Sequence, residues 1–280
     1  MIKLIYDIST QDLAYNTLKN LLRSTDDYIE YFIQKVKMVY SRDIHMSNLD
    51  ICQKMIDILR IDLDIIDLAY LQIAFTHITT SNNGCIDIKN NGLMGLDQVI
   101  MSENEVTNFL HTYDVYIDVK HEIIETNRGI CSITPIYDNV SDERKKYSHL
   151  GTKIYNDFSI CGFYYYSLTH PYGGRVHKRP EILNEISRVV NGVDLSREWE
   201  NTFKKTYAIK SIVPMDKVDT YFIGSYENDT NYNFKIGLLN RALYKIYADT
   251  NMQNENCILK KNVSVLPSEI IEIKQIVIEN

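Results

Sequence analysis

Polar side chains gather where an apolar run ends near residue 80. The run 70–75 has the composition of a buried strand, and His77, Thr79, Asn82 and Asn83 follow it. An imidazole, a hydroxyl and amides at a strand end can hydrogen-bond a ribose diol or a carboxamide. The pattern predicts a nucleotide pocket. The structural alternative is a satisfied histidine at a strand terminus, followed by a Ser/Asn turn.

A second polar group lies between residues 175 and 181. Glu181 follows Pro180, where an acidic residue in the first turn of a helix is favoured by the helix dipole. The neighbouring Arg175 and Arg179 could pair with a diphosphate or with a nucleic-acid phosphate, or could simply be exposed. Glu181 is therefore a candidate functional carboxylate with an ordinary structural explanation beside it.

The elements that must position these residues follow from the apolar spacing. Residues 9–68 are predicted to be helical, and Ser9 and Thr10 can cap the first helix. Further helices are expected over 84–92, 103–113, 141–158, 181–190, 195–204 and 234–249. Strands are expected over 70–80, 115–119, 122–126, 130–137, 160–168, 207–214 and 218–224, with a strand–turn–strand after residue 254. Short strands that do not alternate strictly with helices favour an α+β fold.

Composition narrows the classes of function. The chain has 280 residues, 45% apolar residues and a net charge of −7, so no global basic field attracts nucleic acid. The segment 141–188 reverses this balance, with eight Lys or Arg against five Asp or Glu. It could form a local basic patch or a solvated charged face.

The sequence lacks the motifs of several other classes of protein. No run approaches the roughly 20 apolar residues of a membrane span, and the N-terminus does not resemble a signal peptide, so no membrane partner is expected. The five scattered cysteines form no CxxC pair, which favours reduced thiols, a cytoplasmic location and no metal site. Neither GxGxxG nor GxxxxGK[ST] occurs, so no glycine-rich phosphate loop is predicted.

The stretch around His77 resembles the opening motif of the ADP-ribosyltransferase superfamily. That motif is His-x-Thr, a polar segment and a short helix ending in Gly-Leu, matched here by His77, Thr79, Ile86, Ile88, Gly92 and Leu93. Poly-ADP-ribose polymerases, RNA 2′-phosphotransferases and toxins that ADP-ribosylate nucleic acid share this opening. The resemblance implies that His77 holds the nicotinamide ribose of NAD and that Thr79 and Asn83 also contact the NAD.

The run from Glu255 resembles the last motif of the same family, in which a Glu opens a strand. The resemblance implies that Glu255 binds the 2′-hydroxyl of the ribose and offsets the positive charge on the sugar as nicotinamide leaves. Glu181 is the rival carboxylate, and a solvated Glu at a loop end is the structural alternative for Glu255. Tyr137 is the first choice for the aromatic that stacks on nicotinamide, and Tyr155 the second.

The sequence thus predicts an NAD-dependent ADP-ribosyltransferase with NAD as substrate and no metal. A helical N-terminal region, 1–68, would precede a catalytic domain, 69–280, with a split mixed β-sheet and inserted helices. The 178 positions between His77 and Glu255 imply an insertion, such as 141–205. The resembling toxins and the basic segment favour RNA or DNA as acceptor, whereas the overall acidity favours a protein or a small molecule. The resemblance also implies a toxin or phage-defence effector with a neutralising antitoxin.

Two other interpretations remain open. Arg144 and His149 form an Arg-x4-His pattern on a predicted helix, which resembles the ribonuclease motif of HEPN-type toxins. A ribonuclease of that kind would need no NAD. The other is a non-catalytic interaction protein that keeps the fold without turnover.

Overall fold

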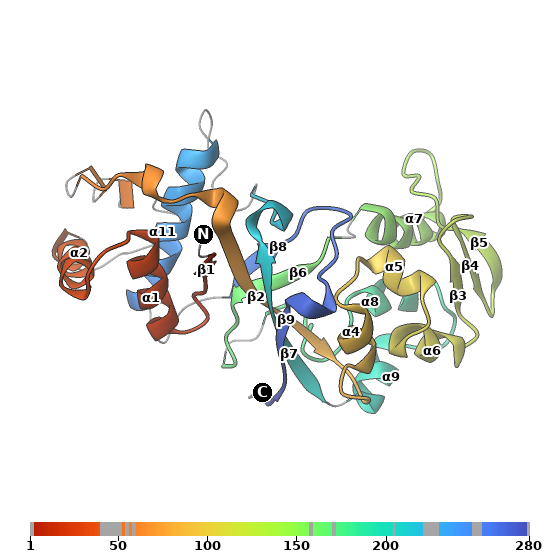
Figure 1. Ribbon diagram of the computed structural model, residues 1–280. Helices are drawn as coiled ribbons and strands as arrows, with labels where there is room; N and C mark the ends of the chain where they lie inside the picture. Colours follow the sequence, from red (N-terminus) through yellow and green to blue (C-terminus); the bar gives the residue numbers. More distant parts are fainter. Residues whose placement is uncertain are drawn as a thin grey trace. The chain divides into compact units, whose positions relative to one another are not determined.

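The computed structural model shows a mixed α+β protein (Figure 1). It describes residues 3–39, 52–53, 56–57, 60–156, 159–169, 172–203, 205–220, 230–247 and 254–278. The chain forms two compact units, each built from three segments. The first unit is Met1–Phe75, Phe163–Ser167 and Ile212–Ile258, and the second is Thr76–Gly162, Leu168–Ser211 and Leu259–Asn280.

The first unit combines helices with strand segments. Its helices are α1 (Gln11–Leu21), α2 (Asp26–Val39), α11 (Thr230–Tyr247) and the 3-10 helices η1 (Leu63–Ile65), η2 (Leu68–Tyr70) and η3 (Met215–Lys217). Its strands are β1 (Leu4–Tyr6), β8 (Glu255–Ile258) and parts of β2 (Leu71–Thr80), β6 (Cys161–Tyr165) and β7 (Thr206–Pro214). The strand order includes β8-β6-β2, and β1 pairs in parallel with β2.

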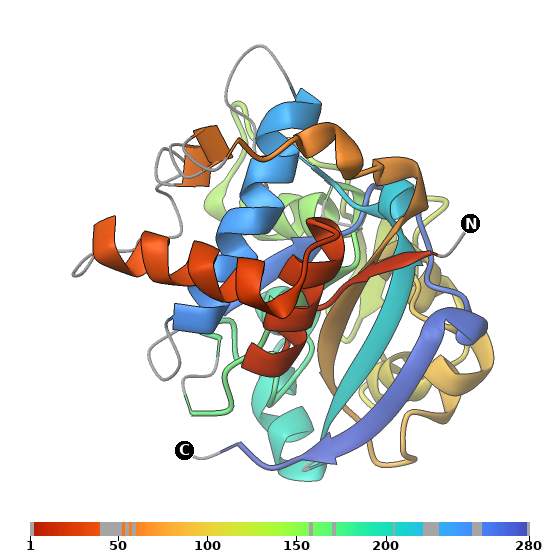
Figure 2. The same ribbon diagram turned by 60° about the vertical axis from the view of Figure 1, so that its left-hand side comes forward.

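Helix α1 begins and packs as its sequence predicts. Thr10 is the N-cap, and its hydroxyl accepts the backbone N–H of Leu13 at 3.2 Å. Ala14, Leu18 and Leu21 are buried at helical spacing. This apolar stripe allows α1 to pack on α11, and Figure 2 shows the two helices (red and blue) side by side.

The second unit holds most of the shorter elements. Its helices are α4 (Ile86–Asn91), α5 (Leu96–Met101), α6 (Glu105–His111), α7 (Asp142–Asn156), α8 (Ile182–Ser187), α9 (Leu195–Thr202) and the 3-10 helix η4 (Pro267–Glu269). Strands β3 (Tyr116–Asp118), β4 (Ile123–Thr126) and β5 (Gly129–Ser132) form an antiparallel sheet. Its share of the larger sheet has the order β6-β2-β7-β9, where β9 (Ile270–Ile276) pairs antiparallel with β7.

The core of the second unit centres on Trp199 of α9. This side chain is fully buried, and its ring stacks on Phe203 with a centroid distance of 3.7 Å. Phe109 meets it edge-on at 5.0 Å. The indole N–H donates to the hydroxyl of Thr80 at 2.7 Å, so the one polar atom of the ring is satisfied. This bond ties the C-terminal end of β2 to α9.

Gly92 ends helix α4 at a point of close backbone approach. Its φ is +81°, and a Cβ at this position would lie 1.9 Å from the carbonyl oxygen of Val265. The next residue, Leu93, exchanges two backbone hydrogen bonds with Val265, at 3.0 and 2.9 Å. A glycine is therefore needed here both for conformation and for space.

Most of the predicted elements are confirmed, with a few differences. Residues 133–137 form no strand, because Pro135 lacks an N–H and the Ile136 N–H bonds the Ser148 hydroxyl at 3.1 Å. Helix α5 was not predicted from the spacing of apolar residues.

The predicted helical region 9–68 is wrong over 61–67, which holds one 3-10 helix, η1, between extended residues, because Asp62 and Asp67 each accept the backbone N–H two residues further on. The part of the predicted helical region over 40–51 lies outside the described residues, as does the predicted strand beyond residue 220.

The predicted domain boundary stays a prediction. The proposed ranges, 1–68 and 69–280, are continuous, whereas each compact unit of the structure collects distant segments. Strands β2, β6 and β7 contribute residues to both units. None of the helices in the described part of the chain is both long enough and apolar enough to cross a membrane.

Candidate functional site

His77 lies on β2 with its ring fixed by the backbone. Its Nδ1 is 2.8 Å from the carbonyl oxygen of Cys161 on β6. Burial lowers the pKa of the imidazole, although this carbonyl contact acts in the opposite direction. The ring is therefore neutral near pH 7. Because a carbonyl only accepts, Nδ1 carries the proton and Nε2 is a hydrogen-bond acceptor.

The loop after β2 is held by one carboxylate from α6. Glu105 accepts the backbone N–H of Asn82 at 2.9 Å and that of Asn83 at 3.1 Å, both on Oε1. Its Oε2 accepts the hydroxyl of Ser81 at 2.5 Å. Three donors on one carboxylate fix the backbone directly after the segment that carries His77 and Thr79.

Asn83 has a structural task in this loop. Its side-chain oxygen accepts the backbone N–H of Ile86 at 3.0 Å, at the start of α4, and lies 3.0 Å from the hydroxyl oxygen of Ser81. The predicted contact of Asn83 with NAD would have to use its amide N–H₂. Thr79 is half-buried on the same strand as His77. The loop thus positions α4 relative to β2.

Glu255 opens β8 in the first unit and is engaged by a cation. Its Oε1 lies 2.5 Å from Nε of Arg241 on α11, and the side chains are only 12% and 13% exposed. Burial tends to lower the pKa of the Arg241 guanidinium, but the charges of Glu255 and Tyr6 prevail and the pKa is raised. Glu255 is thus half of a buried ion pair, and its predicted catalytic role stays a prediction.

Glu269 is a carboxylate that the motif comparison passed over. It immediately precedes β9 and belongs to the second unit, as His77 does. Its Oε2 accepts the backbone N–H of Leu266 at 2.7 Å. The signal was present in the sequence, because this Glu directly precedes a run rich in isoleucine, SEIIEIKQI. Two glutamates therefore stand at strand starts in the C-terminal run, Glu255 as the first residue of β8 and Glu269 directly before β9.

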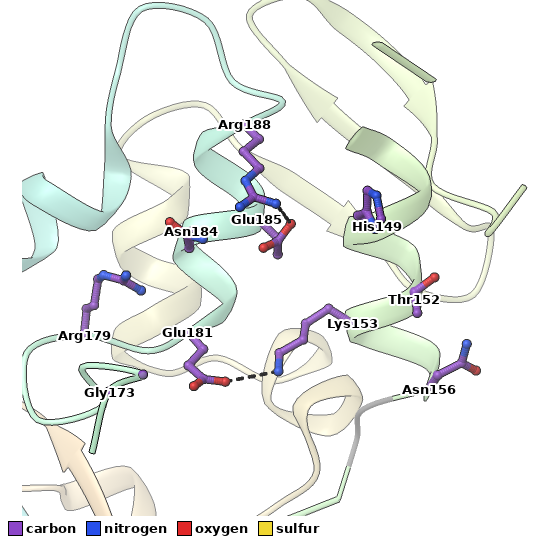
Figure 3. Close-up of a pocket in the computed structure, with 11 residues that line it drawn as sticks. His149, Thr152, Lys153, Asn156, Gly173, Arg179, Glu181, Asn184, Glu185 and Arg188 are labelled. Carbon is purple, nitrogen blue, oxygen red and sulfur yellow. Dashed lines mark hydrogen bonds and ion pairs between the residues drawn. The ribbon is translucent and has the colours of Figure 1, made fainter. Parts of the chain in front are cut away.

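A pocket of about 680 Å³ lies between α7, the loop before α8, and α8 itself (Figure 3). This volume falls in the range of sites for small molecules. The lining is polar and comprises His149, Thr152, Lys153, Asn156, Gly173, Gly174, Arg179, Glu181, Asn184, Glu185 and Arg188. The sequence placed Arg179 beside Glu181, but it did not bring them together with α7.

Ion pairs organise this pocket. Lys153 reaches from α7 to Glu181, with 3.1 Å between Nζ and Oε2, as the dashed line in Figure 3 shows. Arg188 pairs with Glu185 at 2.9 Å along α8. The rival carboxylate Glu181 thus faces a cavity, at the N-cap position of α8 rather than inside the helix.

Of the two candidate aromatics, Tyr137 contacts residues of the pocket. Its hydroxyl lies 2.5 Å from that of Thr152, and its ring meets His149 edge-on at 5.3 Å. Tyr155 instead donates its hydroxyl to the carbonyl of Val119 at 3.0 Å, and burial raises its pKa to about 12. Tyr155 therefore has the environment of a core residue.

Arg144 and His149, the pair proposed for RNA cleavage, have different surroundings in the structure. The guanidinium of Arg144 donates to the carbonyl of Thr134 at 2.8 Å and to the hydroxyl of Ser148 at 3.3 Å. It thereby fastens the segment before α7. His149 lines the pocket. The ribonuclease interpretation requires both side chains to act on one phosphate.

The fold and these contacts define a mixed α+β protein with a charged pocket in its second unit. No group of His, Cys, Asp or Glu within the described residues is arranged to hold a metal ion. Comparisons with protein families, with curated proteins and with solved structures find no match for this chain.

Proposed function

We propose that the protein is an NAD-dependent ADP-ribosyltransferase. The observation that supports this most is the geometry around His77. The ring carries an Nε2 acceptor on β2, and a loop hydrogen-bonded to Glu105 leads into a short helix that ends at Gly92. Nε2 can accept a hydrogen bond from a ribose hydroxyl, which is the role that the resemblance implies.

The reaction begins when the bond between the ribose C1′ and the nicotinamide nitrogen breaks. Nicotinamide leaves with the bonding electron pair, and positive charge develops on the sugar. An acceptor oxygen or nitrogen then attacks C1′ and loses its proton. A carboxylate fixed near the sugar lowers the barrier by offsetting the charge. Glu255, Glu269 and Glu181 are the candidates for this carboxylate.

The test is nicotinamide release from NAD by the purified protein, with RNA, DNA or cell lysate as source of acceptor. We expect release that depends on an acceptor and falls about 100-fold or more in the variant that lacks the carboxylate. Glu255→Gln, Glu269→Gln and Glu181→Gln, compared at equal folded fraction, identify that residue. Absence of release under all these conditions would reject the proposal and favour a binding role.

The ribonuclease alternative makes a distinct prediction. It requires RNA cleavage without NAD, abolished by His149→Ala. The bonds from Arg144 to Thr134 and Ser148 use two of the five N–H donors of the guanidinium and give this side chain a structural role beside any catalytic one. A role as a toxin or phage-defence effector, with a nucleic-acid acceptor and an antitoxin, belongs to the proposal through the family resemblance.

A further inference from the structure

Three cationic side chains from separate parts of the second unit line the pocket of Figure 3. Lys153 comes from α7, Arg179 from the loop that follows Gly173 and Gly174, and Arg188 from the end of α8. Among the described residues, the carboxylates that line the same cavity are Glu181 and Glu185. Like charges repel, so cations gathered from separate elements favour an anion between them.

Arg179 is held in place from outside the pocket. Its Nε lies 3.3 Å from Oε1 of Glu200 on α9, and Oε2 of Glu200 accepts Nη2 of Arg175 at 2.8 Å. The Arg179 side chain is only 13% exposed. A guanidinium carries five N–H donors, and this contact through Nε involves one of them. Glu200 therefore orients a nearly buried cation without lining the cavity itself.

The two internal carboxylates occupy places that a phosphate can take. Glu181 neutralises Lys153, and Glu185 neutralises Arg188, through N···O contacts of 3.1 and 2.9 Å. Phosphate oxygens accept the same charge-assisted hydrogen bonds at the same distances. Arg179 adds a third cation whose carboxylate partner lies elsewhere. Among the described lining residues, three cations therefore face two carboxylates, which leaves one positive charge in excess.

The remaining lining suits a nucleoside rather than a bare phosphate. A cavity of about 680 Å³ is far larger than one phosphate group needs. Asn156 and Asn184 supply donors and acceptors for a base or a sugar. His149, braced by the ring of Tyr137, supplies a planar surface at the side of α7.

We propose that this pocket binds a nucleoside phosphate, with Lys153, Arg179 and Arg188 on the phosphate and with Asn184 and His149 on the nucleoside. This inference rests on the cavity and its charges and does not require the proposed transferase activity. A free nucleotide, a nucleotide within a strand and the adenosine diphosphate part of NAD share this chemistry. The pocket is therefore a recognition site for one of these three.

The test is equilibrium binding at low salt of AMP, NAD and a single-stranded RNA oligonucleotide, with adenosine and inorganic phosphate as partial ligands. We expect AMP to bind more tightly than adenosine or phosphate. Arg179→Gln and Lys153→Gln should each weaken AMP binding by roughly tenfold or more. Lys146→Gln on α7 and Arg197→Gln on α9 are the matched controls, because both side chains are exposed and neither lines the pocket.

A variant that gains affinity is also needed, because misfolding can explain a loss of binding but not a gain. Glu185→Gln removes the partner of Arg188 and should tighten AMP binding severalfold. The tightest of the three nucleotide ligands identifies the source of the phosphate. Binding that is unchanged in both Arg179→Gln and Lys153→Gln, or no AMP binding at millimolar concentration, would overturn the inference. Nicotinamide release plays no part in this test, so its failure and that of the transferase proposal are distinguishable.

Discussion

At the scale of single residues, Glu255 shows how a carboxylate that resembles a catalytic group can have a structural partner. It forms an ion pair with Arg241, and both side chains are nearly buried. Removing one partner of such a pair leaves an uncompensated charge, whereas replacing both with apolar groups can be neutral. Loss of activity in a Glu255 variant must therefore be read together with its stability.

We predict that Glu255→Leu lowers the free energy of unfolding by about 3 kcal/mol, because Arg241 is left buried without its carboxylate. The double variant Glu255→Leu/Arg241→Leu should recover most of this loss. Urea unfolding of both variants and of the wild type measures the difference. A single variant that costs less than about 1 kcal/mol would contradict the buried pair.

Two histidines should make the protein sensitive to mild acid. Burial lowers the pKa of His77, and burial with the charges of Lys178 and Arg175 lowers that of His177. The unfolded chain then binds more protons than the folded protein, from the lowered pKa values up to about 6.5. Stability should therefore rise with pH through this window and level off above it.

The measurement is the thermal unfolding midpoint between about pH 4.5 and 7.5. His177→Gln should make the midpoint depend less on pH, and adding His77→Gln in a double variant should reduce this dependence further. The negative charge of Glu200 acts against these effects, because it favours the protonated ring and so raises the pKa of His177. An unchanged slope in the double variant would show that other groups control the acid sensitivity.

At the scale of elements, the end of α4 depends on contact with a distant backbone. Gly92 combines a positive φ with a carbonyl oxygen of Val265 in the space of its missing side chain. Gly129, at the start of β5, also has a positive φ, but nothing lies within 4 Å of the corresponding Cβ position. A comparison of the two glycines therefore distinguishes the cost of the backbone conformation from the cost of a steric clash.

We predict that Gly92→Ala destabilises the protein by clearly more than Gly129→Ala. Both substitutions place an alanine at a positive φ, which costs about 1–3 kcal/mol of backbone strain. Only Gly92→Ala must also push apart the backbones of α4 and of the segment before η4. Chemical unfolding of the two variants gives the comparison, and equal losses would show that the contact with Val265 contributes little.

At the scale of the whole molecule, each compact unit is discontinuous along the chain. Strands β2, β6 and β7 contribute residues to both units, so separation of the units would have to divide three strands. We therefore predict a single cooperative unfolding transition.

The sequence supplies a local probe for this prediction. Trp199 is the one tryptophan of the chain and is buried in the second unit. Its fluorescence and the far-ultraviolet circular dichroism of all helices should give coincident unfolding curves in urea. Curves that are separated along the denaturant axis would show that the units unfold independently.

The sequence by itself determined the local elements of this protein. Apolar spacing, the Thr10 cap and the stop at Gly92 predicted α1, β2 and α4, because helix ends and buried faces depend on neighbours along the chain. It also placed His77 on β2, although this residue lies inside the strand and not at its end. It misjudged 133–137, where the hydroxyl of Ser148, a residue further along the chain, takes the backbone bond of a strand.

Only the tertiary structure decided which functional groups meet. It paired Glu255 with Arg241, placed Glu269 in the unit of His77, and joined Lys153, Arg179 and Arg188 around one pocket. Periodicity records which face of an element is buried, but not which other element covers that face. The contacts of a site depend on that second choice, which is made by the packing of the whole chain.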